Sequence, residues 1–86
     1  MSPSIDHQSP LLRRIGQRLK RARELAGLSQ NDLAYLVCMS RASIANLEAG
    51  RQDMPITRLA LIAQMVDLDV ADLVRADYVS TTGRRP

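Results

Sequence analysis

The stretch that decides the fold of this chain, residues 29–51, reads SQNDLAYLVCMSRASIANLEAGR. Ser29 and Ser40 each precede a helical run, and a serine hydroxyl there can accept a hydrogen bond from a free N–H of the first turn. Asp32 follows Ser29 at the spacing of a capping box, and its charge suits a helix N-terminus. Only residues 37–39 separate the two runs. Two short helices joined so tightly must cross at a steep angle, which is the helix-turn-helix arrangement.

Length and composition limit what else the chain can be. Its 86 residues form one small domain, 45% hydrophobic but only 2% aromatic. A core of Leu, Ile, Val, Ala and Met suits packed helices better than strands. No apolar run is long enough to cross a bilayer and the N-terminus resembles no signal segment, so we expect a cytoplasmic protein with no membrane partner. A single cysteine gives neither an internal disulfide nor a metal-ligand set.

Charge is distributed unevenly along the chain. Residues 11–27 carry six basic side chains and one acidic one, whereas residues 52–79 carry two basic and five acidic ones. If the basic segment and the acidic segment lie on opposite sides of the molecule, they would orient it toward a polyanion. The simpler alternative is that the basic residues only form a solvated, charged face of the first helix. We favour the phosphate interpretation, because the second helix of a helix-turn-helix usually enters the major groove of DNA.

The spacing of apolar residues predicts an all-α fold, a compact bundle of five short helices without strands. Besides the two helices of the motif, a first helix begins near Pro10 and ends at Gly27, a fourth begins at Pro55, and Asp69 caps a fifth. The expected core residues are Leu12, Ile15, Leu19, Ala22, Ala26, Leu33, Ala34, Val37, Ile44, Leu47, Ile56, Leu59, Ile62, Ala63, Val66, Val70, Leu73 and Val74.

The two ends of the chain differ in composition from its middle. Residues 1–10 carry three serines and two prolines, so we expect a flexible arm, followed by a domain at 11–79 and a flexible tail at 80–86. The only histidine, His7, lies in that arm. No nucleophile–base set and no metal cluster is visible, so we expect neither an enzyme nor a cofactor.

Three segments match the sequence pattern of a known family in order and spacing. They are GLSQNDLA at 27–34, SRASIANLEAGR at 40–51 and MPITRLALIAQMVDLDVADL at 54–73. Together they resemble the Cro/repressor-like helix-turn-helix family, also called the xenobiotic-response-element family, over about residues 11–75. The resemblance implies a lambda repressor-like DNA-binding fold. It also implies a sequence-specific transcriptional regulator of bacterial or phage origin, in our interpretation a repressor that binds double-stranded DNA.

The resemblance implies that the start of the second helix of the motif reads base edges. The residues at the matching positions are Ser40, Arg41, Ala42, Ser43 and Asn46. Arg41 can offer a bidentate fork to guanine, Ala42 can only touch a thymine methyl, and Asn46 can bond an adenine edge or a phosphate. The simpler alternatives are that Arg41 only neutralises a phosphate, and that Ser40 and Ser43 only cap the helix.

Phosphate contacts are implied around the same motif. Ser29 and Gln30 begin its first helix, whose free N–H groups would face a phosphate, and family members use the matching glutamine on the DNA backbone or to brace a recognition side chain. Arg51 and Gln52 follow the second helix and would lie along the same strand, and Arg14 on the first helix could reach it. For Gln30, the simpler alternative is a solvent-exposed residue.

Two further features come from the same resemblance. Related proteins often carry a paired arginine and glutamate at the positions of Arg23 and Glu48, which implies a structural ion pair that fixes the recognition helix. Cys38 and Asp67 stand where glycine is frequent, and a positive φ is costly for a residue with a Cβ. We therefore expect a slightly remodelled turn at Cys38, and we interpret that thiol as inert, with a redox switch as the alternative.

A single domain with few base contacts discriminates weakly, so we expect a homodimer that reads two half-sites of a palindromic operator. The expected dimer surface is Val70, Val74, Tyr78 and Val79, and packing of the last helix on the core is the simpler alternative. No small-molecule substrate is expected.

A protein-bridging module of the same fold, coactivator-like or antitoxin-like and with weak DNA affinity, is the alternative function. The side chains of Ala42 and Ala45 are small and apolar, so the second helix of the motif offers few groups for hydrogen bonds to bases. Such a surface would suit a protein-bridging module. The salt dependence of DNA affinity separates the two hypotheses. Phosphate contacts make the affinity fall steeply as salt is added, whereas a bridging module would show little DNA affinity at physiological salt.

Overall fold

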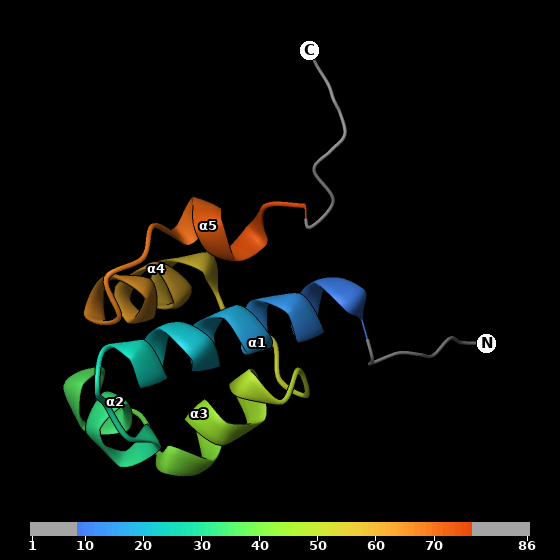
Figure 1. Cartoon of the computed structure of the whole chain (residues 1–86). Helices are drawn as coiled ribbons and strands as arrows, with labels where there is room; N and C mark the ends of the chain where they lie inside the picture. The colour runs from blue at the N-terminus through green and yellow to red at the C-terminus, as the bar shows by residue number, and fades with distance from the viewer. Residues whose placement is uncertain (1–8, 77–86) are drawn as a thin grey trace.

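The computed structural model describes residues 9–76, in which five helices follow one another. They are α1 (Pro10–Leu25), α2 (Gln30–Leu36), α3 (Arg41–Glu48), α4 (Ile56–Met65) and α5 (Val70–Val74). Helix α1 crosses the middle of the molecule, with α2 and α3 on one side of it and α4 and α5 on the other (Figure 1). The predicted all-α five-helix bundle is confirmed, and residues 9–76 contain no strand. None of the helices in this range is long and apolar enough to cross a membrane.

Side-chain caps begin the helices at the predicted serine and aspartate positions. The hydroxyl oxygen of Ser29 accepts from the N–H of Asp32, and the Asp32 carboxylate accepts from the N–H of Ser29, both at 2.9 Å. Ser40 caps α3 by accepting from the N–H of Ser43 at 3.0 Å, and Asp69 caps α5. Each bond satisfies an N–H that has no partner inside its own helix, so these residues fix where α2, α3 and α5 begin.

Four helices, α1 to α4, end in the same hydrogen-bonded turn, in which the residue after the C-cap has a positive φ. Glycine takes that place after α1 (Gly27, φ 76°) and α3 (Gly50, φ 75°), but Cys38 (φ 57°) and Asp67 (φ 62°) take it after α2 and α4. The N–H groups of Cys38 and Met39 still close the turn on carbonyl oxygens of α2, at 3.3 and 2.9 Å. The expected remodelling at Cys38 is therefore wrong, because the two hydrogen bonds of the turn hold the left-handed conformation despite the Cβ.

The core draws on all five helices, and every one of its buried apolar residues was expected. They are Ile15, Leu19, Ala22, Leu33, Ala34, Val37, Ile44, Leu47, Leu59, Ile62, Ala63, Val66 and Leu73. Leu12 and Val70 are half-buried, and Val74 is exposed. The prediction is wrong for Ile56, which is 59% exposed, for Ala26 and for Val74. All three lie at a helix end, where the apolar stripe continues past the surface that other helices cover.

Helices α1 and α3 meet backbone to backbone at Gly16. A Cβ built on Gly16 would lie 2.5 Å from the carbonyl oxygen of Leu47 and closer still to that of Glu48. We expect Gly16→Ala to lower the free energy of unfolding by about 1–3 kcal/mol, because the two helices would have to separate. Helix propensity alone would change the free energy of unfolding in the opposite direction, because it favours alanine over glycine by about 1 kcal/mol.

Urea denaturation of Gly16→Ala checks this expectation. Gln17→Ala, on the exposed part of the same helix, is the matched control and should change the free energy of unfolding by less than about 0.5 kcal/mol. A Gly16→Ala protein as stable as the native one would show that the close approach of α1 and α3 is not needed for the fold.

Candidate nucleic-acid interface

The residues predicted to read bases lie at the start of α3, on the side of α1 that also carries α2 (Figure 1). Ser40, Arg41 and Ala42 are exposed, whereas Ser43 and Asn46 are half-buried. Ser40 accepts from the N–H of Ser43 and donates its hydroxyl to the Ser43 hydroxyl at 3.0 Å. The capping alternative thus describes Ser40, which is the N-cap of α3, but not Ser43, whose N–H is the group that is capped. Arg41 is the long polar side chain at this exposed end.

A chain of side-chain hydrogen bonds connects α1 to this end of α3. Arg23 and Glu48 form a bidentate ion pair, with Nε to Oε2 at 2.6 Å and Nη2 to Oε1 at 3.1 Å. The amide nitrogen of Gln30 donates to Oε1 of Glu48 at 3.0 Å, and Nη1 of Arg41 donates to Oε1 of Gln30 at 2.9 Å. Arg23 also donates from Nη1 to the carbonyl oxygen of Leu28 at 2.8 Å. Four polar side chains from three helices are thereby held in one arrangement.

The ion pair is removed from water. The side chains of Arg23 and Glu48 are only 8% and 3% exposed. The hydrogen bond to Glu48 raises the pKa of Arg23, and this effect outweighs the lowering that burial causes. A bidentate charge pair at such burial is strongly directional, so it fixes the angle between α1 and the C-terminal turn of α3.

Gln30 occupies the first position of α2, half-buried, with both ends of its amide hydrogen-bonded. The solvent-exposed alternative therefore does not describe this residue. Of the two uses that the resemblance implies, the hydrogen bond to Arg41 is the contact that bracing a recognition side chain would require.

The predicted phosphate contacts at the far end of α3 lie near the start of α1. Arg51 is exposed directly after Gly50, and Gln52 and Arg14 are half-buried. A Cβ on Gly50 would lie 3.0 Å from the Cα of Arg13, so the first turns of α1 pack against the turn that ends α3. The buried Nε of Arg14 has no hydrogen-bond partner among residues 9–76. The fold thus brings Arg14 and Arg51, which are 37 positions apart in the sequence, to one end of α3.

Arg18 has a structural role that sequence patterns do not reveal. Its Nη1 donates to the carbonyl oxygens of Asp72, Leu73 and Arg75, at 3.0, 3.3 and 2.6 Å. A cation at a helix C-terminus satisfies carbonyl groups that have no partner inside the helix and complements the helix dipole. Arg18 therefore holds α5 on α1.

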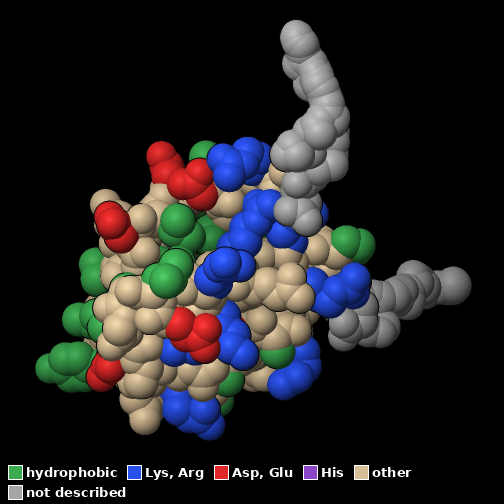
Figure 2. Space-filling model, in the orientation of Figure 1, with side chains coloured by type: hydrophobic (Ala, Val, Ile, Leu, Met, Phe, Trp, Pro, Cys, Tyr) green, Lys and Arg blue, Asp and Glu red, His purple; other side chains and the backbone are tan. Residues whose placement is uncertain are grey.

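Charge is only partly separated in space. Figure 2 shows basic side chains spread over α1 and toward α3 on the visible face, and acidic side chains near α5 and the α4–α5 junction, with further acidic side chains lower on the same face. Asp67, Asp69 and Asp72 belong to that acidic end. Within the described part of the chain, no three His, Cys, Asp or Glu side chains lie where they could hold a metal ion together.

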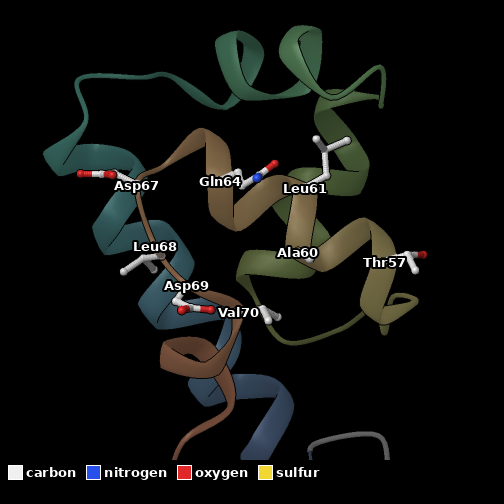
Figure 3. Close-up of a pocket in the computed structure, with 8 residues that line it drawn as sticks. All are labelled: Thr57, Ala60, Leu61, Gln64, Asp67, Leu68, Asp69 and Val70. Carbon is white, nitrogen blue, oxygen red and sulfur yellow. The ribbon is translucent and has the colours of Figure 1, made fainter.

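The predicted dimer surface is only partly within the described residues. Val70 is half-buried at the rim of an open hollow of about 650 Å³ between α4 and α5, which Leu61 and Leu68 also line (Figure 3). Val74 is 39% exposed on α5. Tyr78 and Val79 lie outside the described residues, as do residues 1–8 of the expected arm and the whole expected tail.

The capping box that starts α2 makes the stability of the protein depend on pH. Hydrogen bonds from the N–H and hydroxyl of Ser29 lower the pKa of the Asp32 carboxyl. Because the folded-state pKa lies below the unfolded value of about 3.9, this contribution to stability is complete above the unfolded pKa and is lost as pH falls through the folded pKa. We expect the difference in unfolding free energy between the native protein and Asp32→Asn to be largest near neutral pH and to vanish in acid. Denaturation curves at several pH values test this, and a difference independent of pH would contradict it.

Comparisons with known proteins show which family shares this fold. Residues 14–76 match the family model of a helix-turn-helix domain, and a comparison with curated proteins finds no match. The clp gene regulator ClgR from Corynebacterium glutamicum is 26% identical over 77% of this chain and 70% of its own, with a TM-score of 0.71. The restriction-modification controller C.AhdI from Aeromonas hydrophila is 31% identical over 72% of this chain and 94% of its own, with a TM-score of 0.67.

A third similar structure includes DNA. The controller protein C.Esp1396I, as a tetramer in complex with its natural 35-base-pair operator, is 28% identical over 76% of this chain and 86% of its own, with a TM-score of 0.67. The family match covers most of the chain, and the solved relatives share its fold. The chain therefore belongs to the Cro/repressor-like family of helix-turn-helix DNA-binding regulators.

Proposed function

We propose that this protein is a sequence-specific repressor that binds a palindromic operator as a homodimer, with α3 in the major groove. The observation that carries the proposal is the position of Arg41, exposed at the first residue of α3 and held there by Gln30. Only Nη1 of Arg41 is used by that bond, so the other guanidinium N–H groups are available to O6 and N7 of a guanine. The proposed phosphate contacts are Ser29, Gln30, Arg51, Gln52 and Arg14.

The homodimer is supported by the surface on the acidic side of the molecule and by a relative. Val70 and Leu61 line the open hollow between α4 and α5, where a second copy could bury them (Figure 3). The relative C.Esp1396I binds its operator as a tetramer. A repressor of this kind acts where the chromosome is, which in a bacterium is the cytoplasm.

Selection of random duplex DNA by the purified protein at physiological salt, followed by sequencing, tests the proposal. An enriched inverted repeat with half-site centres about 34–36 Å apart, one helical turn, would establish a dimeric operator. No enriched motif would contradict the proposal and favour the protein-bridging module, for which the bare surface of α3 at Ala42 and Ala45 is the supporting feature.

Two matched arginine variants separate base reading from phosphate binding. We expect Arg41→Ala to relax selection at one base position per half-site, because a bidentate contact with guanine contributes about 1–3 kcal/mol of discrimination. Arg51→Ala removes the same charge but should weaken all sequences alike. Binding of each variant to the selected operator and to its single-base derivatives measures both effects. Uniform weakening by both would reduce Arg41 to a phosphate contact.

A further inference from the structure

Two helices with different proposed roles, α3 at the DNA and α5 at the dimer surface, are held on the same part of α1. We infer that Arg18 is a positioning residue for operator recognition. It fixes the position of α5 relative to α3, and thereby the spacing of the two half-sites that the homodimer accepts. This inference rests on the proposed function and adds to it a residue that determines half-site spacing without touching DNA.

Helix α1 is the element that connects these two helices. Figure 1 shows α3 and α5 on opposite sides of α1. The backbone of α3 lies against Gly16, where a Cβ would meet the carbonyl oxygen of Leu47. Arg18, two residues further along α1, holds the end of α5. A helix rises only about 1.5 Å per residue, so both contacts belong to one short and rigid part of α1. The position of α5 relative to α3 therefore depends on how firmly each is held there.

Helix α5 has few anchors of its own. It is five residues long, and Leu73 is the one of those five that is buried. A helix this short is not stable without tertiary contacts, and its last carbonyl groups have no partner inside it. Nη1 of Arg18 donates to three carbonyl oxygens in and after this helix, those of Asp72, Leu73 and Arg75, at 3.0, 3.3 and 2.6 Å. The buried leucine fixes the distance of α5 from the core, and the bonds to the backbone fix its angle.

The angle of α5 affects DNA binding because a homodimer contains it twice. Val70 and Val74 of α5 belong to the predicted dimer surface. A two-fold dimer uses the same patch of both protomers, so a change in the angle of α5 is doubled in the angle between the two α3 helices. One additional base pair between half-sites rotates one of them by about 35° and moves it by about 3.4 Å. A homodimer with a fixed α5 should therefore accept one spacing, whereas a loose α5 would accept several.

Arg18→Met tests the inference on operators that differ only in the number of base pairs between half-sites. The native protein should bind the selected spacing about tenfold or more tightly than a spacing one base pair longer, because the longer one requires distortion of DNA or protein. Arg18→Met should reduce this ratio to about threefold or less and leave the affinity for a single half-site unchanged, since α3 is not altered.

A matched control and a second variant keep this test decisive. Lys20→Met removes the same charge from an exposed position of α1 and should keep the native ratio. If Arg18→Met does not fold, Arg18→Lys takes its place, because its ammonium ends one bond short of the position of Nη1, and the ratio should fall in the same direction. Equal weakening at every spacing would overturn the inference, since a general loss of stability has that effect.

A measurement without DNA separates this inference from the proposed function. The N–H of Arg75 donates to the carbonyl oxygen of Ala71 at 3.0 Å, and the N–H of Ala49 at the end of α3 donates to that of Ala45 at 3.0 Å. Arg18→Met should speed amide hydrogen exchange at Arg75 about ten- to hundredfold, the effect of losing hydrogen bonds to a charged group, and leave exchange at Ala49 unchanged.

The two failures are distinguishable. Native exchange at Arg75 in Arg18→Met would overturn the inference, and a selected operator would leave the proposed function standing. A native protein that selects no operator would overturn the proposed function, while faster exchange at Arg75 would still show that Arg18 positions α5.

Discussion

Glu48→Leu should lower the free energy of unfolding by about 3–5 kcal/mol, because it leaves the guanidinium of Arg23 buried without a counter-ion. The Arg23 side chain is only 8% exposed, so water cannot replace the lost carboxylate without opening the contact between α1 and α3. Domains of this size have a stability of about 5–10 kcal/mol, so the loss is about half of the total. Thermal or urea denaturation followed by circular dichroism measures it. A loss below about 1 kcal/mol, the value of an exposed pair, would contradict the expectation.

The double variant Arg23→Met/Glu48→Leu is the control that identifies the cause. Replacing both charges by apolar side chains of similar volume is often neutral or stabilising, so the double variant should recover most of the lost stability. A double variant as unstable as Glu48→Leu would mean that packing, and not the unpaired charge, caused the loss.

Local signals explain how much of this fold the sequence predicts. Caps such as Ser29, Ser40 and Asp69 act on N–H groups two or three residues away, and glycines such as Gly27 act within one turn. The periodic apolar stripe identifies the core wherever other helices cover it. It fails at Ile56, because the first turn of α4 extends beyond that cover.

What the sequence alone could not show depends on contacts between distant residues. Gly16 looks like a weak point inside a helix, and only the fold shows the α3 carbonyl oxygens that exclude a side chain there. Arg18 resembles its basic neighbours until the carbonyl groups at the end of α5 are placed beside it. The bond between Gln30 and Glu48 joins residues 18 positions apart, and no periodicity indicates it.

DNA affinity should fall steeply with salt. The proposed contacts include two charged side chains per protomer that face phosphates, Arg14 and Arg51, which makes four in a homodimer. Each phosphate neutralised by Lys or Arg contributes about −0.9 to the slope of log Kobs against log salt, so a slope of about −3.6 is expected. Raising salt from about 50 to 200 mM should then weaken operator binding about a hundredfold. Fluorescence anisotropy of a labelled operator duplex over this range measures the slope, and a slope near zero would favour the protein-bridging function.

The change that a substitution causes in the slope of log Kobs against log salt also shows how many protomers bind the operator. Arg51→Ala should make the slope less negative by nearly 2 if two protomers bind the operator, but by only about 0.9 if one does. Gln52→Ala is the matched variant, since Gln52 is the next residue in the chain and carries no charge. It should weaken binding without changing the slope, because an uncharged contact releases no counterion. An unchanged slope for Arg51→Ala would show that Arg51 does not contact a phosphate. The proposed orientation of α3 on DNA would then have no charged phosphate contact at the C-terminal end of that helix.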